Sequence, residues 1–368
     1  MNNYAVIMAG GVGTRFWPKG TLKFPKQFLK IGSEYDTLLQ QAYKRLEKVF
    51  HHAKIFVVTN TIYKNEVKKQ LPKIPEENII CEPIGRNTAP CIGLACVFIN
   101  KFHHEANVLV VAADHIITEE DEFHRVIKSG LNFVKENGGI VTLGIHPTKP
   151  ETGYGYIQYD TDKVFEAELE NNGATITEKI YKVKTFAEKP NPEVAKAFLE
   201  SGDFLWNSGM FIFRTDTMME EFKNYMPELY SALNHLNERM LSKDFPKILE
   251  EEYSKLKSIS IDYGVMEKAK EVYIIRSRFG WNDVGAWDEV YNINEKDKDG
   301  NVKQGRTVTI NTKNCLIIND QKIAAVIGVE DLLIINTDNG LLICRKGDSQ
   351  SVKEVVDYLR RKGFDQFL

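Results

Sequence analysis

The first thirty residues combine residue types that suit the binding of phosphate groups. An apolar run, residues 4–9, leads directly into the glycine-rich stretch 10–15, and two cations, Arg15 and Lys26, lie at its end and shortly after it. A buried strand that ends in glycines leaves bare backbone N–H groups to which a phosphate can come close. Arginine adds a planar fork of donors, and lysine adds a compact positive charge. We therefore expect a site for the phosphates of a nucleotide.

Two better-known glycine motifs do not fit this loop. The P-loop requires Gly-Lys-[Ser/Thr], which the chain lacks. The dinucleotide fingerprint starts at Gly11 but has Phe16 where its third glycine belongs, and Pro18 shortens any helix that follows. The plain alternative is a tight turn flanked by solvated cations. The added presence of Arg15 and Lys26 favours the functional interpretation.

Two aspartates are candidates to hold a metal ion. Asp114 follows the apolar run 108–111, and a carboxylate at the carboxyl end of a strand suits Mg²⁺, which binds few protein carboxylates together with phosphate oxygens. Asp283 lies between two tryptophans in residues 281–287, a pattern that favours a rigid loop. Taken alone, Asp114 is equally explained as a turn or cap residue, and the loop of Asp283 as an aromatic corner of the core.

Four further segments place glycines or polar side chains at strand and helix ends: residues 82–90, 152–156, 186–190 and 206–210. The first leads from a strand into a helix, where its polar groups either read a base edge or cap the helix. The glycines of 152–156 mark a close ligand or a bulge. The charges of 186–190 form a binding group or a surface pair, and the asparagine of 206–210 binds a hydroxyl or shapes a turn.

Composition indicates an ordinary soluble globular protein. The 368 residues suffice for one large domain and a smaller one, with 43% hydrophobic and 27% charged residues. The net charge of −3 argues against nucleic-acid and membrane-surface binding. We expect neither a signal peptide nor a membrane span. The five scattered cysteines include no Cys-x-x-Cys pair, so we expect no zinc site or disulfide framework, and a cytoplasmic location.

Strand and helix patterns alternate up to about residue 145. Continuous apolar runs predict buried strands at 4–9, 55–58, 108–111 and 140–143. Helices are predicted after a cap at Asp36, over 88–101 and over 120–136. This alternation is typical of a Rossmann-like, doubly wound, mainly parallel α/β sheet with helices on both faces. Because ligands of such sheets bind at the carboxyl ends of strands, we expect the glycine loop and Asp114 to converge.

Beyond residue 300 the alternation of strand and helix patterns gives way to a series of short strands. Short strands are predicted at 308–310, 315–318, 324–327, 332–335 and 341–343, before a closing helix over about 350–362. We divide the chain into a larger domain, residues 1–295, and a β-rich domain, residues 300–368, at a polar stretch between them. The second carries more apolar residues than so short a segment can bury alone, so it should pack on the larger domain of a monomer or on another subunit, and we expect a homodimer.

Taken together, these motifs resemble one family over nearly the whole chain, the mannose-1-phosphate guanylyltransferases of the sugar nucleotidyltransferase superfamily. The glycine loop and residues 186–190 mark the superfamily, whereas residues 25–29, 86–90 and 281–287 are more specific to the branch that uses mannose and guanosine. Two departures stand out. Gly20-Thr21 replaces a Ser-Arg pair of many relatives, a charge that Lys19 or Lys23 would have to supply, and Ala112 replaces a proline.

The resemblance implies transfer of a guanylyl group from GTP to mannose 1-phosphate, with Mg²⁺ as cofactor, in a nucleotidyltransferase domain. It implies catalytic roles for Arg15, Lys26 and Asp114, with Asp114 and Asp283 as the metal ligands. The implied nucleotide contacts are Gly10, Gly11, Gly13, Thr14, Gly85, Asn87 and Thr88. The implied sugar-phosphate contacts are Gly153, Glu188, Lys189, Asn207 and Gly209.

Two alternatives stay open at this point. The same loop and lysine would serve a related enzyme that uses UTP or dTTP. A non-catalytic relative that binds GDP-mannose would be expected to lack Arg15, Lys26 or one of the two aspartates, and all four are present.

Overall fold

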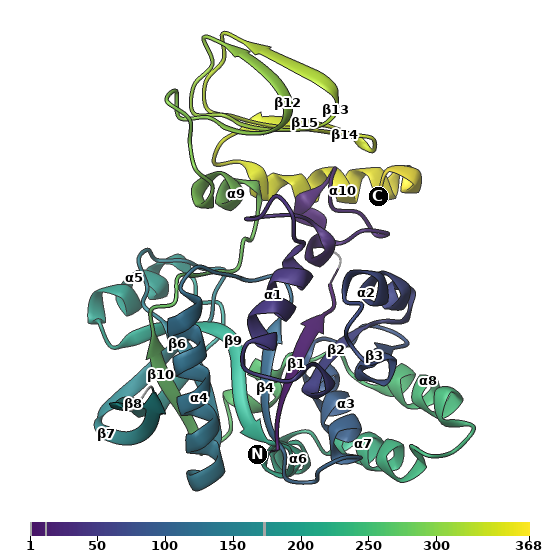
Figure 1. Ribbon diagram of the computed structural model, residues 1–368, viewed down its shortest axis with the longest axis vertical. Helices are drawn as coiled ribbons and strands as arrows, with labels where there is room; N and C mark the ends of the chain where they lie inside the picture. Colours follow the sequence, from purple (N-terminus) through teal and green to yellow (C-terminus); the bar gives the residue numbers. More distant parts are fainter. Residues whose placement is uncertain (1, 12, 172–173) are drawn as a thin grey trace. The chain divides into compact units, whose positions relative to one another are not determined.

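The computed structural model describes residues 2–11, 13–171 and 174–368, so Val12 of the glycine loop lies outside the described residues. The chain forms two compact units that alternate along the sequence (Figure 1). The sheet unit comprises residues 1–10, 42–113 and 117–281, and the C-terminal unit comprises residues 11–41, 114–116 and 282–368. Residues 11–41 therefore fold with the end of the chain, a grouping that the sequence did not suggest.

A nine-stranded sheet forms the centre of the sheet unit, in the order β3-β2-β1-β4-β9-β6-β10-β8-β7. The four strands β3, β2, β1 and β4 are parallel to one another, β6 is parallel to β10, and β9 is antiparallel to both of its main neighbours, β4 and β6. Its strands are β1 Asn3–Ala9, β2 Ile55–Asn60, β3 Ile79–Glu82, β4 Asn107–Ala112, β6 Ile140–Ile145, β7 Tyr156–Asn171, β8 Ala174–Ala187, β9 Phe204–Arg214 and β10 Val272–Ser277. This sheet confirms the predicted α/β class.

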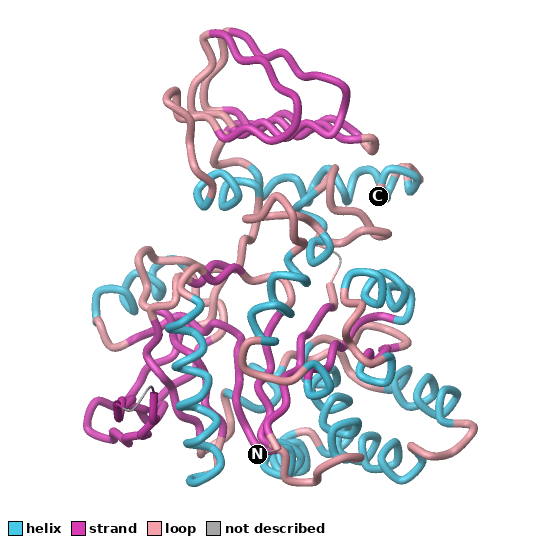
Figure 2. Tube along the Cα trace, in the orientation of Figure 1, coloured by secondary structure: helices cyan, strands magenta, loops and turns pink. Residues whose placement is uncertain are grey.

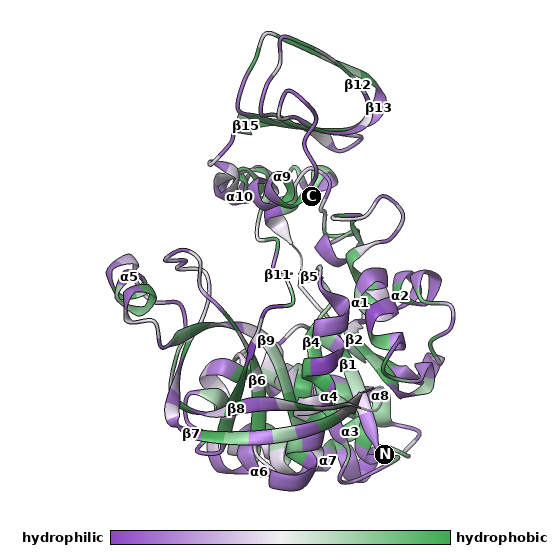
Figure 3. Cartoon of the chain, turned by 60° about the vertical axis from the view of Figure 1, so that its left-hand side comes forward, coloured by the Kyte–Doolittle hydropathy of each residue, from purple (hydrophilic) through white to green (hydrophobic). Residues whose placement is uncertain are grey.

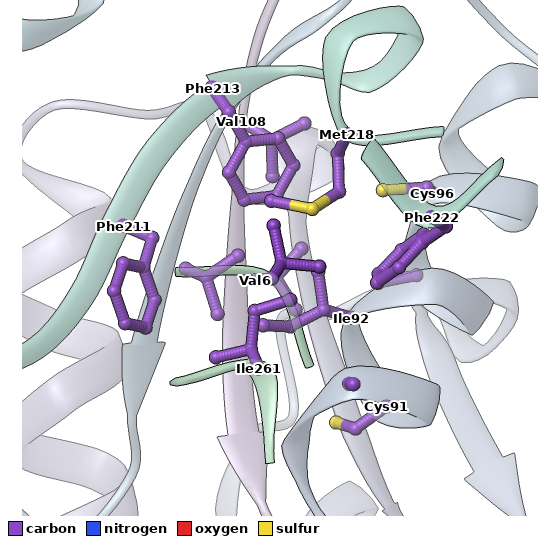
Figure 4. Close-up of a cluster of buried hydrophobic side chains, with 14 of the residues drawn as sticks. Val6, Cys91, Ile92, Cys96, Val108, Phe211, Phe213, Met218, Phe222 and Ile261 are labelled. Carbon is purple, nitrogen blue, oxygen red and sulfur yellow. The ribbon is translucent and has the colours of Figure 1, made fainter. Parts of the chain in front are cut away.

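Successive side chains of a strand point to opposite faces of the sheet, and on the apolar strands the side chains on both faces are buried. Helices therefore cover both faces of this sheet. On one face, Val6 and Val108 pack with Phe222 of α6, as Figure 4 shows. On the other face, Gly130 of α4 lies against Ile212. The helices with residues in this unit are α1 Leu38–Glu47, α2 Lys64–Gln70, α3 Thr88–Asn100, α4 Glu120–Asn137, α5 Pro192–Ser201, α6 Thr215–Tyr225, α7 Pro227–Arg239 and α8 Phe245–Lys255. In Figure 3 the central strands are correspondingly green, the colour of hydrophobic residues.

The cap of α1 differs from the prediction. Gln40 N–H donates to the Thr37 Oγ1 at 3.2 Å, and Thr37 N–H donates to the Gln40 Oε1 at 3.0 Å. This reciprocal pair is a capping box, so Thr37 rather than Asp36 occupies the cap. The two adjacent residues are both good cap formers, and only the pairing with Gln40 distinguishes them.

The C-terminal unit contains a coil of stacked strands. β12 Val302–Ile310, β13 Leu316–Ile327 and β14 Leu332–Thr337 are parallel neighbours, and β15 Gly340–Arg345 closes the sheet antiparallel to β14. The strands predicted at 315–318 and 324–327 form a single strand, β13, because both pair with β12 on either side of an irregularity near Gly305. In Figure 2 the long strands β12 and β13, drawn in magenta, bend as they follow the coil.

Residues that follow the glycine loop belong to the core of this coil. Phe16 and Leu29 are buried with Leu316 and Leu333 of the strands and with Val352 of the last helix. The helices α9 Trp287–Ile293 and α10 Val352–Arg361 also belong to this unit. The short strands β5 Ile116–Ile117 and β11 Trp281–Asn282 lie where the chain passes between the units. Among the described helices, none is long and apolar enough to cross a membrane.

Candidate active site

The glycine loop takes a backbone course that requires glycine at two positions. Gly11 and Gly13 have φ of +96° and +54°, in the left-handed region that side chains disfavour. A Cβ on Gly13 would also lie 2.6 Å from the Cβ of Lys26. Thr14 and Arg15 follow in a 3₁₀ turn, Thr14–Phe16. The absence of side chains here lets the loop lie directly on the lysine.

Lys26 links two distant parts of the chain. Its Nζ donates to Asp114 Oδ2 at 2.7 Å and to the main-chain carbonyl of Asp283 at 2.5 Å. The lysine is 7% exposed, so its charge is held in place among these oxygens. Burial acts to raise the pKa of Asp114, but the positive charges of Lys26 and His115, together with the hydrogen bonds that the carboxylate accepts, outweigh it, and the net pKa is lowered. Asp114 therefore stays ionised.

One pocket of about 390 Å³ gathers the predicted phosphate and metal residues. Its lining consists of Gly13, Thr14, Arg15, Phe16, Lys26, Asp114, His115, Asp283, Gly285 and Lys353. The expected convergence of the glycine loop with Asp114 is thus confirmed. Sequence reasoning missed Lys353, because nothing in its local sequence distinguishes it from other surface lysines.

The loop of Asp283 is held by the aromatic residues that flank it. Asn282 Oδ1 accepts the N–H of Val284 at 2.7 Å, and Val284 has a φ of +45°, a strained value for a β-branched residue. Trp287 is fully buried, and its ring packs edge-to-face on Phe16 with 5.1 Å between the ring centroids. Its indole N–H donates to the Trp17 carbonyl at 3.1 Å. This loop is therefore both an aromatic corner of the core and a wall of the pocket.

The donor set of this pocket fits Mg²⁺. Asp114 and Asp283 are its carboxylates, and the described residues contain no cluster of three or more His, Cys, Asp or Glu side chains that could enclose a metal. A cation, the Lys26 ammonium, already lies between oxygens of both aspartates. Mg²⁺ takes few protein carboxylates when phosphate oxygens complete its coordination, whereas Zn²⁺ and Ca²⁺ need more ligands from the protein.

A second group of polar residues lies in the sheet unit, around Glu188. Its side chain is 8% exposed, and Oε1 accepts from Lys189 Nζ at 2.7 Å. The other oxygen, Oε2, is buried and has no hydrogen-bond partner in the described structure. Gly155 lies so close that any Cβ there would collide with Oε2. A buried carboxylate oxygen without a donor is costly, so this site is built to receive one.

Asn207 is held by two partners beside this carboxylate. Its Nδ2 donates to Asp262 Oδ1 at 2.9 Å, and its Oδ1 accepts the N–H of Gly209 at 3.0 Å. Burial, followed by the charge of Glu188, raises the pKa of Asp262 to about 6. Asp262, which the sequence analysis did not single out, orients Asn207. The Gly209 N–H, predicted to contact the sugar, is occupied by this bond.

Gly153 is the glycine predicted to contact the sugar, whereas Gly155 is the one that lies against Glu188. Gly153 is exposed and donates its N–H to Glu151 Oε1 at 3.1 Å. Gly155 is the residue beside the carboxylate. The motif contains both glycines, and spacing alone did not separate their roles.

The predicted base-contacting loop is shaped by the start of α3. Asn87 has a φ of +70°, and its side chain accepts the N–H of Thr88 at 2.9 Å. Thr88 Oγ1 accepts the N–H of Ile261 at 2.8 Å. Gly85 is exposed, with open space around it. Helix capping therefore accounts for the oxygen of Asn87, while its amide N–H groups make no hydrogen bond to the described residues.

The structure also describes Gly20-Thr21, which replaces the Ser-Arg pair of many relatives. Thr21 is buried, and Lys19 donates to Asp320 Oδ1 at 2.9 Å. Lys19 therefore holds the loop to the stacked strands, and neither Lys19 nor Lys23 is among the residues that line the pocket.

Comparison with known proteins assigns this architecture. The nucleotidyl transferase family model matches residues 4–300, and the MannoseP isomerase/GMP-like beta-helix domain matches residues 305–359. Mannose-1-phosphate guanylyltransferases of Klebsiella pneumoniae and Escherichia coli are each 37% identical over 362 residues, covering 97% of this chain and 74% of theirs. This chain belongs to the mannose-1-phosphate guanylyltransferase family. It is accordingly an enzyme of the nucleotidyltransferase class.

Solved structures agree with the family assignment. A Thermus thermophilus protein described as a mannose-1-phosphate geranyltransferase superimposes with a TM-score of 0.84 at 32% identity, covering 98% of this chain and 100% of that one. A Helicobacter pylori protein described as a mannose-6-phosphate isomerase shares the fold, with a TM-score of 0.59 at 21% identity over 77% of this chain and 100% of that chain. The predicted resemblance to the guanylyltransferase family is therefore confirmed.

Proposed function

We propose that this guanylyltransferase family member converts GTP and mannose 1-phosphate to GDP-mannose and pyrophosphate. The observation that carries the proposal is the pocket in which Lys26 binds Asp114 and Asp283 beneath the glycine loop. The names of the relatives supply the substrates.

The reaction needs positioning and charge rather than a strong base. An oxygen of the sugar phosphate attacks the α-phosphorus of GTP, and the bond from that phosphorus to the pyrophosphate oxygen breaks. The attacking phosphate is already an anion, so the barrier lies in bringing anions together. Lys26 would contact the α-phosphate, and Arg15 with the N–H groups around Gly13 would hold the rest of the triphosphate. Asp114 and Asp283 would hold Mg²⁺, which neutralises phosphate charge when bound.

The sugar would occupy the group around Glu188. A sugar hydroxyl supplies the donor that Oε2 of Glu188 lacks. Asn207, fixed by Asp262, would present its second N–H to the sugar, and Lys189 would lie near the sugar's phosphate. Gly85, Asn87 and Thr88 would face the guanine base.

We also propose a cytoplasmic homodimer. Several apolar side chains of the stacked strands point outward and are exposed: Val308, Ile310, Ile323, Ile327, Leu341 and Ile343. An apolar surface of this extent favours burial against a second copy. Light scattering of the full chain should give twice the monomer mass at micromolar concentration, and a monomer mass would contradict the dimer.

The substrate assignment is tested by measuring pyrophosphate release over a matrix of GTP, ATP, UTP and dTTP with mannose and glucose 1-phosphates. GTP with mannose 1-phosphate should be the best pair by kcat/KM. A preference for UTP or dTTP would contradict the proposal, and so would binding of GDP-mannose without turnover of any pair.

A further inference from the structure

The pocket that contains Lys26 includes a lysine from the far end of the chain. Lys353 is the second residue of α10, and it lines the pocket together with Thr14, Arg15 and Asp114. More than three hundred residues separate it from the glycine loop. It is exposed, and in the described parts of the chain its ammonium forms no ion pair or hydrogen bond.

The position of Lys353 is fixed by the helix that carries it. α10 packs against the 3₁₀ turn Thr14–Phe16, and its Val352 and Val356 are 2% and 3% exposed (Figure 1). Val352 shares a buried cluster with Phe16 and Trp287. The backbone of Lys353 therefore lies between two buried anchors of the same helix.

The start of the helix is fastened independently. Asp288 accepts the N–H groups of Gly347 at 2.6 Å and Ser349 at 3.2 Å. The hydroxyl of Ser349 donates to the same carboxylate at 2.5 Å. The turn before α10 is therefore tied to α9, which follows directly from the Asp283 loop.

The three cations that line the pocket differ in depth, whereas its two carboxylates are Asp114 and Asp283. Lys26 is buried and already bound to Asp114, whereas Arg15 and Lys353 are both exposed and neither forms an ion pair within the described residues. The deep pair suits the reacting phosphate. The outer cations suit the phosphates of the same nucleotide that remain nearer to solvent and depart after the bond breaks.

We infer that Lys353 binds the leaving pyrophosphate of the nucleoside triphosphate, so that the C-terminal helix completes the active site. The inference rests on the proposed nucleotidyl transfer. In the forward reaction the lysine holds the β- and γ-phosphates of the substrate, and in the reverse reaction it holds free pyrophosphate. It explains why residues 11–41 fold with the end of the chain: both halves of the phosphate site are then built in one unit.

The test compares Lys353→Ala and Lys353→Arg with Lys362→Ala, which removes the same charge just after the same helix and outside the pocket lining. Steady-state rates are measured in both directions, and inorganic pyrophosphate binding is measured by calorimetry. Losing one charge-assisted hydrogen bond should raise the KM for GTP and for pyrophosphate roughly 10-fold or more in Lys353→Ala. The KM for mannose 1-phosphate should stay within about 2-fold, since the sugar site is unchanged.

Lys353→Arg should recover most of the loss, and Lys362→Ala should behave as wild type. Wild-type KM values for GTP and pyrophosphate in a folded Lys353→Ala variant would overturn the inference. So would equal losses in Lys353→Ala and Lys362→Ala, which would indicate an effect of net charge. If the wild-type enzyme prefers another triphosphate, the proposed substrate fails, and the same comparison with that triphosphate still decides the role of Lys353.

Discussion

Glu82, at the end of β3, should keep its proton in the folded protein up to about pH 7, and its replacement by glutamine should change the pH dependence of stability. The carboxyl is 5% exposed. The Tyr253 hydroxyl lies 3.2 Å from Glu82 Oε1 and 3.0 Å from the Pro90 carbonyl. One hydroxyl proton cannot serve two acceptors. When it is ionised, Glu82 accepts from Tyr253, whereas a protonated Glu82 can donate to Tyr253 while Tyr253 donates to Pro90.

The size of the effect follows from the pKa. Burial raises the pKa of Glu82 from 4.5 to about 7, against the opposing effect of the Tyr253 hydrogen bond. At about 1.4 kcal/mol for each pKa unit, this difference lowers the free energy of unfolding by roughly 3.5 kcal/mol at most as the pH rises. The folded state binds the proton more tightly than the unfolded state. Stability is therefore full below about pH 4.5, falls as the pH rises towards 7, and is level above it.

Glu82→Gln keeps the shape, donates its amide N–H to Tyr253, and cannot ionise. Urea unfolding followed by circular dichroism at pH 4, 5, 6, 7 and 8 should show the variant as stable as wild type at pH 4, and increasingly more stable as the pH rises, by up to roughly 3.5 kcal/mol at pH 8. The exposed Glu77→Gln serves as a control, with the wild-type pH profile. A difference between Glu82→Gln and wild type that does not vary with pH would refute the protonated carboxyl.

Four further changes test the site and the unit that builds it. Lys26→Met and Asp114→Asn should each lower kcat by about 10²-fold or more, with native circular dichroism, because each removes one preorganised charge; near-normal turnover would remove that residue from the mechanism. Glu188→Gln should raise the KM for mannose 1-phosphate about 10-fold and leave that for GTP unchanged, and equal changes in both would argue against a sugar contact. A chain ending at Gly300 should aggregate or lose turnover because Phe16 loses its buried surroundings, and a soluble active fragment would show that the stacked strands are dispensable.

Local patterns predicted the central strands well because continuous apolar runs in this part of the chain occur where both faces of the sheet are buried. They also placed Asp114 at the correct edge, since a strand end is a local feature. Lys353 could not be found in this way, because its role depends on α10 packing against a loop near the other end of the chain. Similarly, the sequence contains both Gly153 and Gly155, but only the course of the backbone decides which one lies against Glu188.

The stacking of β12, β13 and β14 also could not be predicted from local sequence patterns. Their apolar character was readable, but parallel pairing depends on which segments lie side by side. The sequence showed no clear repeat that would have indicated a coil. Residues 11–41 were likewise assigned to the larger domain, because chain order gives no sign that their apolar side chains are buried by the last seventy residues.

The most direct test of the central claim is the formation of GDP-mannose by the purified protein. With GTP, mannose 1-phosphate and Mg²⁺, chromatography should show GDP-mannose and pyrophosphate in equal amounts, and omission of the metal or the Lys26→Met change should abolish most of the product. Absence of GDP-mannose from a folded wild-type protein, or an equal yield without Mg²⁺, would contradict the proposed reaction.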